Sequence, residues 1–369
     1  MVKKAPEALN WLIDAGAKIR PTLPRLGGHS THRSHLESRA RGRGFTEPLK
    51  KFAETRGAKI RLNTQVTHIW RDVTDGPVLG VETTAEGEKK NVKVNRALIL
   101  ASGGFSRDVK MRMDFNPSLG PEYNCSNQRG ATGEVIRYAR AVGADALHLE
   151  FIQLYPCAEP EKGAVDSFAL PPYSGTGFGL FYVNRFGTRF VNELDRRDIV
   201  SNAQIKSGAK PTYAILNHRI FKKLATPDEE IQRGLERGRI VQADSIFELS
   251  QKLGISEDAL KDSVAKHNKY IRDGQDPEFN KPMTKSMVPL EEGPYYAIPQ
   301  WPSVHHCMGG LRIDKEAHVI DIWGKPIPKL YAAGEVCGGI HGSNRLAGNA
   351  IPDSIVFGRI AGINAVKEK

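Results

Sequence analysis

Cysteine is scarce in this sequence, and its spacing excludes two kinds of site. The 369 residues contain only four cysteines, Cys125, Cys157, Cys307 and Cys337, with no C-x-x-C pair and no C-x-x-C-H. A zinc ribbon needs closely paired cysteines, and covalent haem attachment needs C-x-x-C-H. The sequence predicts neither, and we interpret Cys307 and Cys337 as small packing residues.

Long apolar runs are also missing. No stretch approaches the length of a membrane span, and no signal peptide is visible before the amphipathic segment that begins near Pro6. Hydrophobic residues make up 40% and charged residues 26%, so the composition is that of a soluble globular protein. We expect a protein of the cytoplasm or the periplasm, without choosing between them.

The net charge of +11 is spread along the chain. The most basic stretch, residues 33–43, is interrupted by Glu37 and has no interleaved aromatic residues. This pattern argues against a nucleic-acid partner and favours a small anionic substrate. The nearby His29, His32 and His35 have no cysteine or carboxylate cluster beside them, so no metal site is predicted.

Residues 330–367 form the most informative stretch of the sequence, because their pattern predicts a strand, a glycine-rich loop and a helix. Apolar residues from Leu330 to Ala333 predict a buried strand, five glycines follow in a loop, and a helix is expected after that. A helix N-terminus after such a loop suits an anion or an electron-rich ring edge. Glu335 can bond hydroxyl groups and Arg345 can clamp a carboxylate. The alternative is a glycine-rich loop that merely caps a helix.

The rest of the sequence predicts both helices and strands. Helices are expected at Pro6–Ala15, Phe45–Arg56, Thr132–Gly143, Ser245–Leu253 and Glu257–Arg272. Strands are expected at Lys59–Leu62, Gln65–Arg71, Val78–Thr84, Asn91–Val94 and Ala97–Leu100, with a hairpin at Tyr182–Val191.

Three further motifs accompany the C-terminal stretch. They are Val304-His-His-Cys-Met-Gly-Gly310, Asn192-Glu-Leu-Asp-Arg-Arg-Asp198 and Ala101-Ser-Gly-Gly-Phe105. Together they resemble the flavoprotein of the soluble fumarate reductase (flavocytochrome c) family, which includes urocanate reductase and related FAD-dependent enoate reductases. 3-Ketosteroid dehydrogenases are more distant relatives.

The resemblance implies a fold and a cofactor. The fold is α/β, with an FAD-binding, Rossmann-like domain of the glutathione-reductase type that is incomplete at its N-terminus and an inserted α+β capping domain. The implied boundaries are 1–153 and 301–369 for the FAD-binding domain and 154–300 for the capping domain. The implied chemistry is reduction of a C=C bond by hydride from flavin N5 and protonation by an arginine.

The resemblance also implies site residues. Arg197 matches the proton donor, and His305 and Arg345, with Gly348 and Tyr155, match substrate-binding positions. The positions that match FAD contacts are Ser102, Gly103, Gly104, His306, Gly334, Glu335, Asn349, Ala350 and Ile351. The alternatives are a structural histidine pair beside a turn, and a solvated arginine in a charge run for Arg197.

Two departures from the family bear on the substrate. Tyr155 stands where fumarate reductases carry a second carboxylate-binding histidine, and residues 170–177 replace a stretch that carries a glutamate and an arginine of the proton relay. Tyrosine is a poor partner for a second carboxylate but a good neighbour for a ring. We expect a substrate with one carboxylate and an extended tail, such as urocanate or cinnamate, rather than fumarate.

The sequence contains no G-x-G-x-x-G turn after a buried strand, which usually opens such domains. We expect one of two explanations. The sequence is a fragment, or one of two polypeptides that together form a single flavin domain; alternatively, it is a truncated homologue that binds FAD poorly or not at all. A partner chain could also carry the electron donor. Two other functions stay open. One is a 3-ketosteroid-type dehydrogenase, and the other is a non-catalytic flavoprotein subunit.

Overall fold

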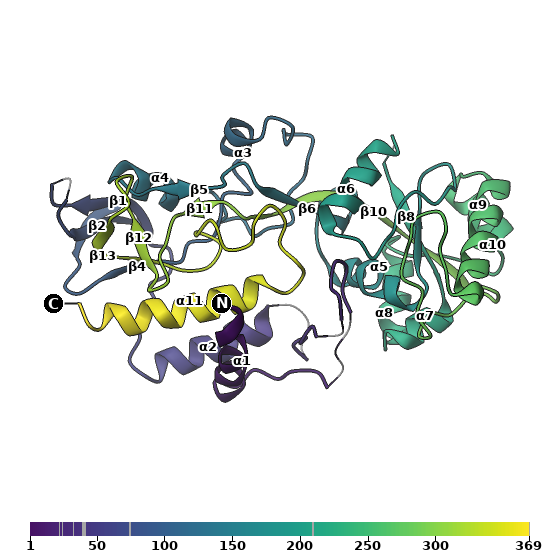
Figure 1. Ribbon diagram of the computed structural model, residues 1–369, viewed down its shortest axis with the longest axis horizontal. Coiled ribbons are helices and arrows are strands. Elements are labelled where there is room, and N and C mark those ends of the chain that lie inside the picture. The colour runs from purple at the N-terminus through teal and green to yellow at the C-terminus, as the bar shows by residue number, and fades with distance from the viewer. Residues whose placement is uncertain are drawn as a thin grey trace.

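Two antiparallel strands, β6 (Ile152–Ala158) and β10 (Tyr295–Cys307), join the two lobes of the molecule (Figure 1). The structure is a computed structural model that describes residues 1–21, 23, 25–31, 33–38, 42–73, 75–208 and 210–368. His32, part of the histidine triplet in the N-terminal loop, lies outside the described residues. No helix in the described ranges is long and apolar enough to cross a membrane.

The first lobe is built on small sheets, three of them among the described residues. One has the order β12-β13-β4, and β13 lies parallel to β4 with Tyr331 opposite Ile99. The second is the antiparallel meander β1-β2-β3, and the third is the antiparallel pair β11-β5. The bounds of the strands are β1 Gln65–Arg71, β2 Val78–Ala85, β3 Glu88–Lys93, β4 Leu98–Leu100, β5 Ala146–Leu147, β11 Gly310–Leu311, β12 His318–Ile320 and β13 Pro326–Ala332. Because β4 and β13 are parallel, the loops that follow them leave the same edge of the sheet.

Helices cover this lobe. They are η1 Val2–Lys4, α1 Ala5–Asp14, α2 Arg43–Glu54, α3 Val109–Phe115, α4 Glu134–Ala141 and α11 Ala350–Ala365. The long helix α11 runs between the strands of the lobe and helix α1 in Figure 1, and its Ala361 packs on Tyr331 of β13. On its other side, Arg359 of α11 stacks over Trp11 of α1 and pairs with Glu7.

The second lobe surrounds the sheet β6-β10-β8-β7, with β9 also paired to β10. Its elements are η2 Ser167–Ala169, α5 Leu170–Ser174, η3 Gly175–Phe178, β7 Phe181–Val183, α6 Arg197–Lys206, β8 Thr212–Asn217, α7 His218–Lys223, α8 Asp228–Glu236, β9 Val241–Ala243, α9 Ile246–Leu253 and α10 Glu257–Asp273. Each lobe has its own apolar core. One core draws on residues 155–298 with Leu26 and Ala347, and the other on residues 69–149 and 307–337.

Most of the expected elements are confirmed, and the mixed α/β class with them. The strand Gln65–Arg71 has the predicted bounds, and the helices α9 and α10 differ from the prediction by one residue. The strand expected at Lys59–Leu62 is wrong: these residues are exposed and the structure pairs them with no strand. The domain boundaries at residues 153 and 300 stay predictions.

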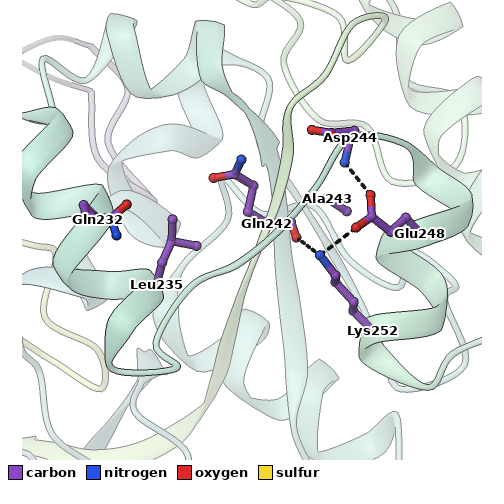
Figure 2. A pocket seen from close by; sticks show the side chains of 7 residues that line it. All are labelled: Gln232, Leu235, Gln242, Ala243, Asp244, Glu248 and Lys252. Carbon is purple, nitrogen blue, oxygen red and sulfur yellow. Dashed lines mark hydrogen bonds and ion pairs between the residues drawn. The ribbon is translucent and has the colours of Figure 1, made fainter.

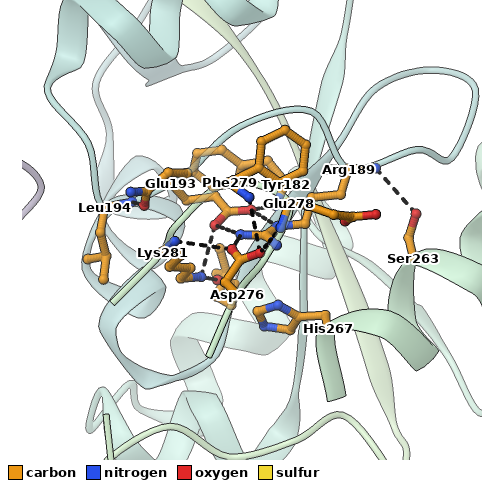
Figure 3. A network of polar contacts seen from close by, with 12 residues as sticks. Tyr182, Arg189, Glu193, Leu194, Ser263, His267, Asp276, Glu278, Phe279 and Lys281 are labelled. Atoms are coloured by element: carbon orange, nitrogen blue, oxygen red, sulfur yellow. Dashed lines mark hydrogen bonds and ion pairs between the residues drawn. The ribbon is translucent and has the colours of Figure 1, made fainter. Parts of the chain in front are cut away.

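A buried network of charges links the segment 187–197 to other parts of the second lobe (Figure 3). Glu193 accepts hydrogen bonds from Arg189 at 2.8 and 3.1 Å, and its second oxygen lies 2.9 Å from Lys281 Nζ. Arg189 also donates to Asp276 at 2.8 Å. The two positive and two negative charges balance, although burial still lowers the pKa of Lys281 to about 8.

Removing one charge from this network should therefore strongly lower the free energy of unfolding. We expect Glu193→Ala to lower the free energy of unfolding by about 3–5 kcal/mol, because Arg189 and Lys281 are left buried with a charge deficit. Asp114→Ala removes the partner of Lys110 in a solvent-exposed pair and should change it by less than about 0.5 kcal/mol. Urea unfolding of both variants measures the difference. Equal losses would contradict the structural role of Glu193.

Candidate active site

Two arginines from different parts of the chain meet at one glutamine where the lobes join. Arg197 begins α6 in the second lobe, Arg345 lies in the loop before α11, and Gln153 lies on β6. Gln153 Oε1 accepts hydrogen bonds from Arg197 Nη1 at 3.2 Å and from Arg345 Nη2 at 3.1 Å. All three side chains are buried. The glutamine thus fixes the separation of the two guanidinium groups.

The amide nitrogen of Gln153 makes a second pair of bonds. It donates to Asn344 Oδ1 and to the backbone oxygen of Arg345, both at 2.7 Å. A glutamate at this position could accept from the arginines but could not donate to these two oxygens. The position therefore needs a neutral amide.

The described residues supply no counter-charge to the arginine pair. In the described ranges, neither Arg197 nor Arg345 forms an ion pair: Glu193 belongs to the network of Figure 3, and Asp198 pairs with Arg196 at 2.8 Å. Arg345 Nε is buried without a hydrogen-bond partner. Burial, and after it the charge of Arg197, lowers the pKa of Arg345 to about 9. A bound anion would satisfy both the free donor and the charge.

Tyrosine rings enclose the Arg197 guanidinium. Its central carbon lies 4.8 Å from the centre of the Tyr155 ring and 4.9 Å from that of Tyr173, which are cation–π distances. Arg197 Nε also donates to the Tyr173 hydroxyl at 3.4 Å. The Tyr155 hydroxyl donates to the backbone oxygen of Ala169 at 3.0 Å. Tyr155 therefore offers the site the face of its ring, and its hydroxyl is already engaged.

His305 completes the group from β10. Its ring centre lies 5.1 Å from that of Tyr155, and its Nδ1 lies 2.7 Å from Ser126 Oγ. Burial, followed by the charges of Arg197 and Arg345, holds the pKa of His305 well below its usual value. The imidazole is therefore neutral at neutral pH, and a neutral imidazole can still donate one hydrogen bond.

A second group of predicted residues lies at the carboxyl ends of β4 and β13. The two loops run side by side, with Ala333 N–H donating to the Leu100 oxygen at 3.0 Å. Glu335 accepts from the backbone N–H of Cys307 at 2.9 Å and from Asn127 at 3.3 Å. His306 Nδ1 lies 3.3 Å from Glu335 Oε2. Burial raises the pKa of Glu335, but His306 and the N–H donors outweigh it and leave the pKa lowered.

This region fits a dinucleotide such as FAD. The crevice at the carboxyl ends of parallel strands is the usual place for such a ligand. Gly103 and Gly334 adopt φ of +81° and +79°, and a Cβ on Gly104 would lie 2.7 Å from Glu335 Oε1. Two buried polar atoms, His306 Nε2 and Asp353 Oδ1, lack partners. The loop backbones can thus approach a ligand closely, and polar groups remain to bind it.

The N-terminus of α11 lies beside these loops. The helix has 16 residues and begins at Ala350, and its N-cap Asn349 makes no side-chain cap. Gly348, with φ of +81°, precedes it. Ala350 and Ile351 are therefore placed where their backbone can face a polar ligand edge. Ser102 lies next to Gly103 in the β4 loop. The individual contacts expected of these residues stay predictions.

The structure also identifies residues that the motifs did not indicate. Gln153 stands two residues before Tyr155 on one strand, so the two side chains share a face, and this spacing could have drawn attention to it. His341 pairs with Asp353 at 3.1 Å beside His306. The loop of Asn127, residues 127–133, resembles a loop of the soluble fumarate reductase family, but no role was expected of Asn127 itself. Ser126 carries no recognisable sequence signal.

A hollow of about 450 Å³ lies elsewhere, on the surface of the second lobe between α8 and α9 (Figure 2). Lys252 there donates to the Gln242 backbone oxygen and pairs with Glu248 at 2.7 Å. None of the predicted site residues lines it. We therefore place the candidate site at the junction of the lobes and not in this hollow.

Two loops at the edge of a parallel strand pair, beside a buried pair of arginines, are the arrangement expected of a dinucleotide-binding α/β protein. The chain belongs to the FAD binding domain family, whose model matches residues 1–351. This confirms the relationship and the cofactor predicted from the motifs.

The chain is similar to longer flavoproteins. It is 35% identical to NADH:acrylate oxidoreductase of Vibrio harveyi over 99% of this chain and 36% of that protein. It is 37% identical to urocanate reductase of Eggerthella lenta over 97% of this chain and 59% of that protein. The structure of the open conformation of a flavocytochrome c3 fumarate reductase matches with a TM-score of 0.76 and 30% identity. The match covers 99% of this chain and 63% of that chain. The chain thus spans about one third to three fifths of these relatives.

The hydrogen bonds of Gln153 can be separated from its lack of charge. We expect Gln153→Glu to weaken binding of a small carboxylate at least about 10-fold, because the new charge neutralises the arginine pair and repels the ligand. Gln153→Met leaves the positive charge of the site unchanged and loses only the hydrogen bonds of the amide, so the loss of binding should be smaller. Isothermal titration calorimetry with acrylate measures the Kd of both variants. Tighter binding by Gln153→Glu would rule out an anion site at these arginines.

Proposed function

We propose that this chain is the flavoprotein part of an FAD-dependent oxidoreductase that reduces the C=C bond of an α,β-unsaturated carboxylate. The observation that carries the proposal is the buried pair Arg197 and Arg345, which shares a neutral amide and lacks a counter-anion. The names of the relatives, which include acrylate, urocanate and fumarate reductases, support the same reaction class.

The substrate carboxylate is bound by Arg345 and His305. Arg345 has an unpartnered Nε, and in the described part of the chain His305 has its Nε2 free, since Ser126 takes up Nδ1. Two donors on one carboxylate also stabilise the enolate-like charge that develops when the β-carbon accepts a hydride. FAD, when bound and reduced, supplies that hydride.

Arg197 is the candidate proton donor to the α-carbon. Addition of one hydride at the β-carbon and one proton at the α-carbon converts the C=C bond to a single bond and leaves the carboxylate intact. Tyr155 and Tyr173 hold the guanidinium between their rings, and Gln153 fixes its direction. Arginine is a very weak acid. Arg197 therefore gives up its proton only as the enolate-like charge of the substrate builds up beside it.

The substrate carries one carboxylate and an apolar or aromatic tail. The position of Tyr155 has no charge, and its hydroxyl is bonded to the backbone oxygen of Ala169. A second carboxylate would meet the ring face there, which repels negative charge. Cinnamate and urocanate fit this description, and acrylate shares the single carboxylate, whereas fumarate carries two.

A ketosteroid-type dehydrogenase is less well supported. Such chemistry needs a tyrosine that gains and loses a proton, and Tyr155 and Tyr173 both donate to backbone oxygens. Burial raises the pKa of Tyr155 well above its usual value, which makes it a poor acid. A steroid would also leave the two arginines without an anion. The division into domains at residues 153 and 300, and a partner chain, remain part of this proposal.

Oxidation of a reduced dye by the FAD-loaded protein tests the function. We expect turnover with acrylate, cinnamate or urocanate in preference to fumarate. Arg345→Ala should lower kcat/KM about 10²–10³-fold, because it removes the carboxylate clamp. Arg197→Ala should lower kcat about 10²–10⁴-fold with little change in KM, as expected for a general acid.

The neighbouring arginine provides the control. Arg196 is exposed and pairs with Asp198, so Arg196→Ala should leave both constants within about twofold. Arg345→Ala and Arg196→Ala with the same activity would contradict the proposed function. Fumarate as the best substrate would contradict only the assignment of a single carboxylate.

A further inference from the structure

A serine of the first lobe holds the imidazole of His305. Ser126 Oγ lies 2.7 Å from His305 Nδ1 and 3.1 Å from the backbone oxygen of Val304. The segment around Ser126 is fixed against β10, because Ser126 N–H donates to the Val304 oxygen and Val304 N–H donates to Asn124, both at 2.8 Å. The serine hydroxyl is therefore a rigidly placed partner of the ring.

The hydroxyl has one proton and two possible acceptors. A separation of 2.7 Å is typical of a hydroxyl donor and lies at the short limit for a ring N–H donor. The Val304 oxygen is farther from the hydroxyl and already accepts the Ser126 N–H. The geometry therefore favours donation from Ser126 Oγ to His305 Nδ1.

Because the ring is neutral, this donation decides which of its two nitrogens carries the proton. A neutral imidazole carries its proton on one nitrogen only, so an acceptor Nδ1 means that Nε2 carries the N–H. The charged groups that act on His305 are Arg197, Arg345 and His306, and all of them oppose a second proton on the ring. The opposite tautomer would turn a lone pair of Nε2 toward the substrate carboxylate.

We propose that Ser126 is a positioning residue that fixes His305 in the Nε2–H tautomer, and so makes it a hydrogen-bond donor to the substrate carboxylate. The tautomer assignment rests on the Ser126 geometry and on the neutral state of the ring, and its consequence for binding rests on the proposed function. Ser126 acts through His305 and touches no substrate itself.

The experiment combines ¹⁵N NMR of the histidine rings with carboxylate binding, both on the FAD-loaded protein. The His305 signals are assigned by their loss in His305→Gln. Without substrate, we expect Nδ1 to have the shift of an acceptor nitrogen and Nε2 that of a protonated one. Ser126→Ala should populate both tautomers and raise the Kd for acrylate about 10-fold, and Ser126→Thr should restore both properties.

Ser303→Ala is the matched control. Ser303 lies on the same strand and its hydroxyl donates to the backbone oxygens of Asn124 and Gly163; among the described residues, its side chain forms no hydrogen bond with His305. It should leave the tautomer and the Kd unchanged.

Three results would decide the matter. A proton on Nδ1 in the unmodified protein overturns the proposal, and so does an unchanged tautomer in Ser126→Ala. The predicted tautomer and its loss in Ser126→Ala, together with no carboxylate binding even by the unmodified protein, support the assignment and contradict the proposed function instead.

Discussion

The two guanidinium groups on the oxygen of Gln153 are the constraint on which the site depends. Both are buried where the lobes join, both carry positive charge, and a neutral amide is their common partner. Bringing two like charges together out of water costs free energy that one amide cannot offset. A site that keeps such a pair is arranged for a ligand of opposite charge, and the tyrosine rings and the neutral His305 around it limit how much negative charge that ligand can carry.

The second lobe shows how the same chain treats charges that serve only the fold. Arg189 and Lys281 are as deeply buried as Arg345, yet Glu193 and Asp276 balance them completely. The contrast lies within one short segment, since Glu193 and Arg197 are four residues apart. The segment therefore anchors itself on the balanced network at one end and presents an unbalanced cation to the site at the other.

Local periodicity in the sequence predicted most helices. The family and the cofactor came from the resemblance of several motifs to the soluble fumarate reductase family. The resemblance also pointed to Arg197, His305 and Arg345, which the structure places around Gln153 and Tyr155. The roles of these residues stay predictions. Gln153 and Ser126 were not singled out, because a neutral amide or hydroxyl acquires meaning from its tertiary neighbours: Arg345 lies 192 residues from Gln153, and His305 lies 179 residues from Ser126. The expected strand at Lys59–Leu62 failed for a similar reason, since β-propensity without a partner strand makes no sheet.

The most direct test of the central claim is a crystal structure of the FAD-loaded protein with a saturated carboxylate, such as propionate, bound. The account predicts the carboxylate at Arg345 and within hydrogen-bond distance of His305 Nε2, with the Arg197 guanidinium above its α-carbon and Gln153 still between the two arginines. A carboxylate bound elsewhere, with Arg197 and Arg345 turned away from each other, would contradict it.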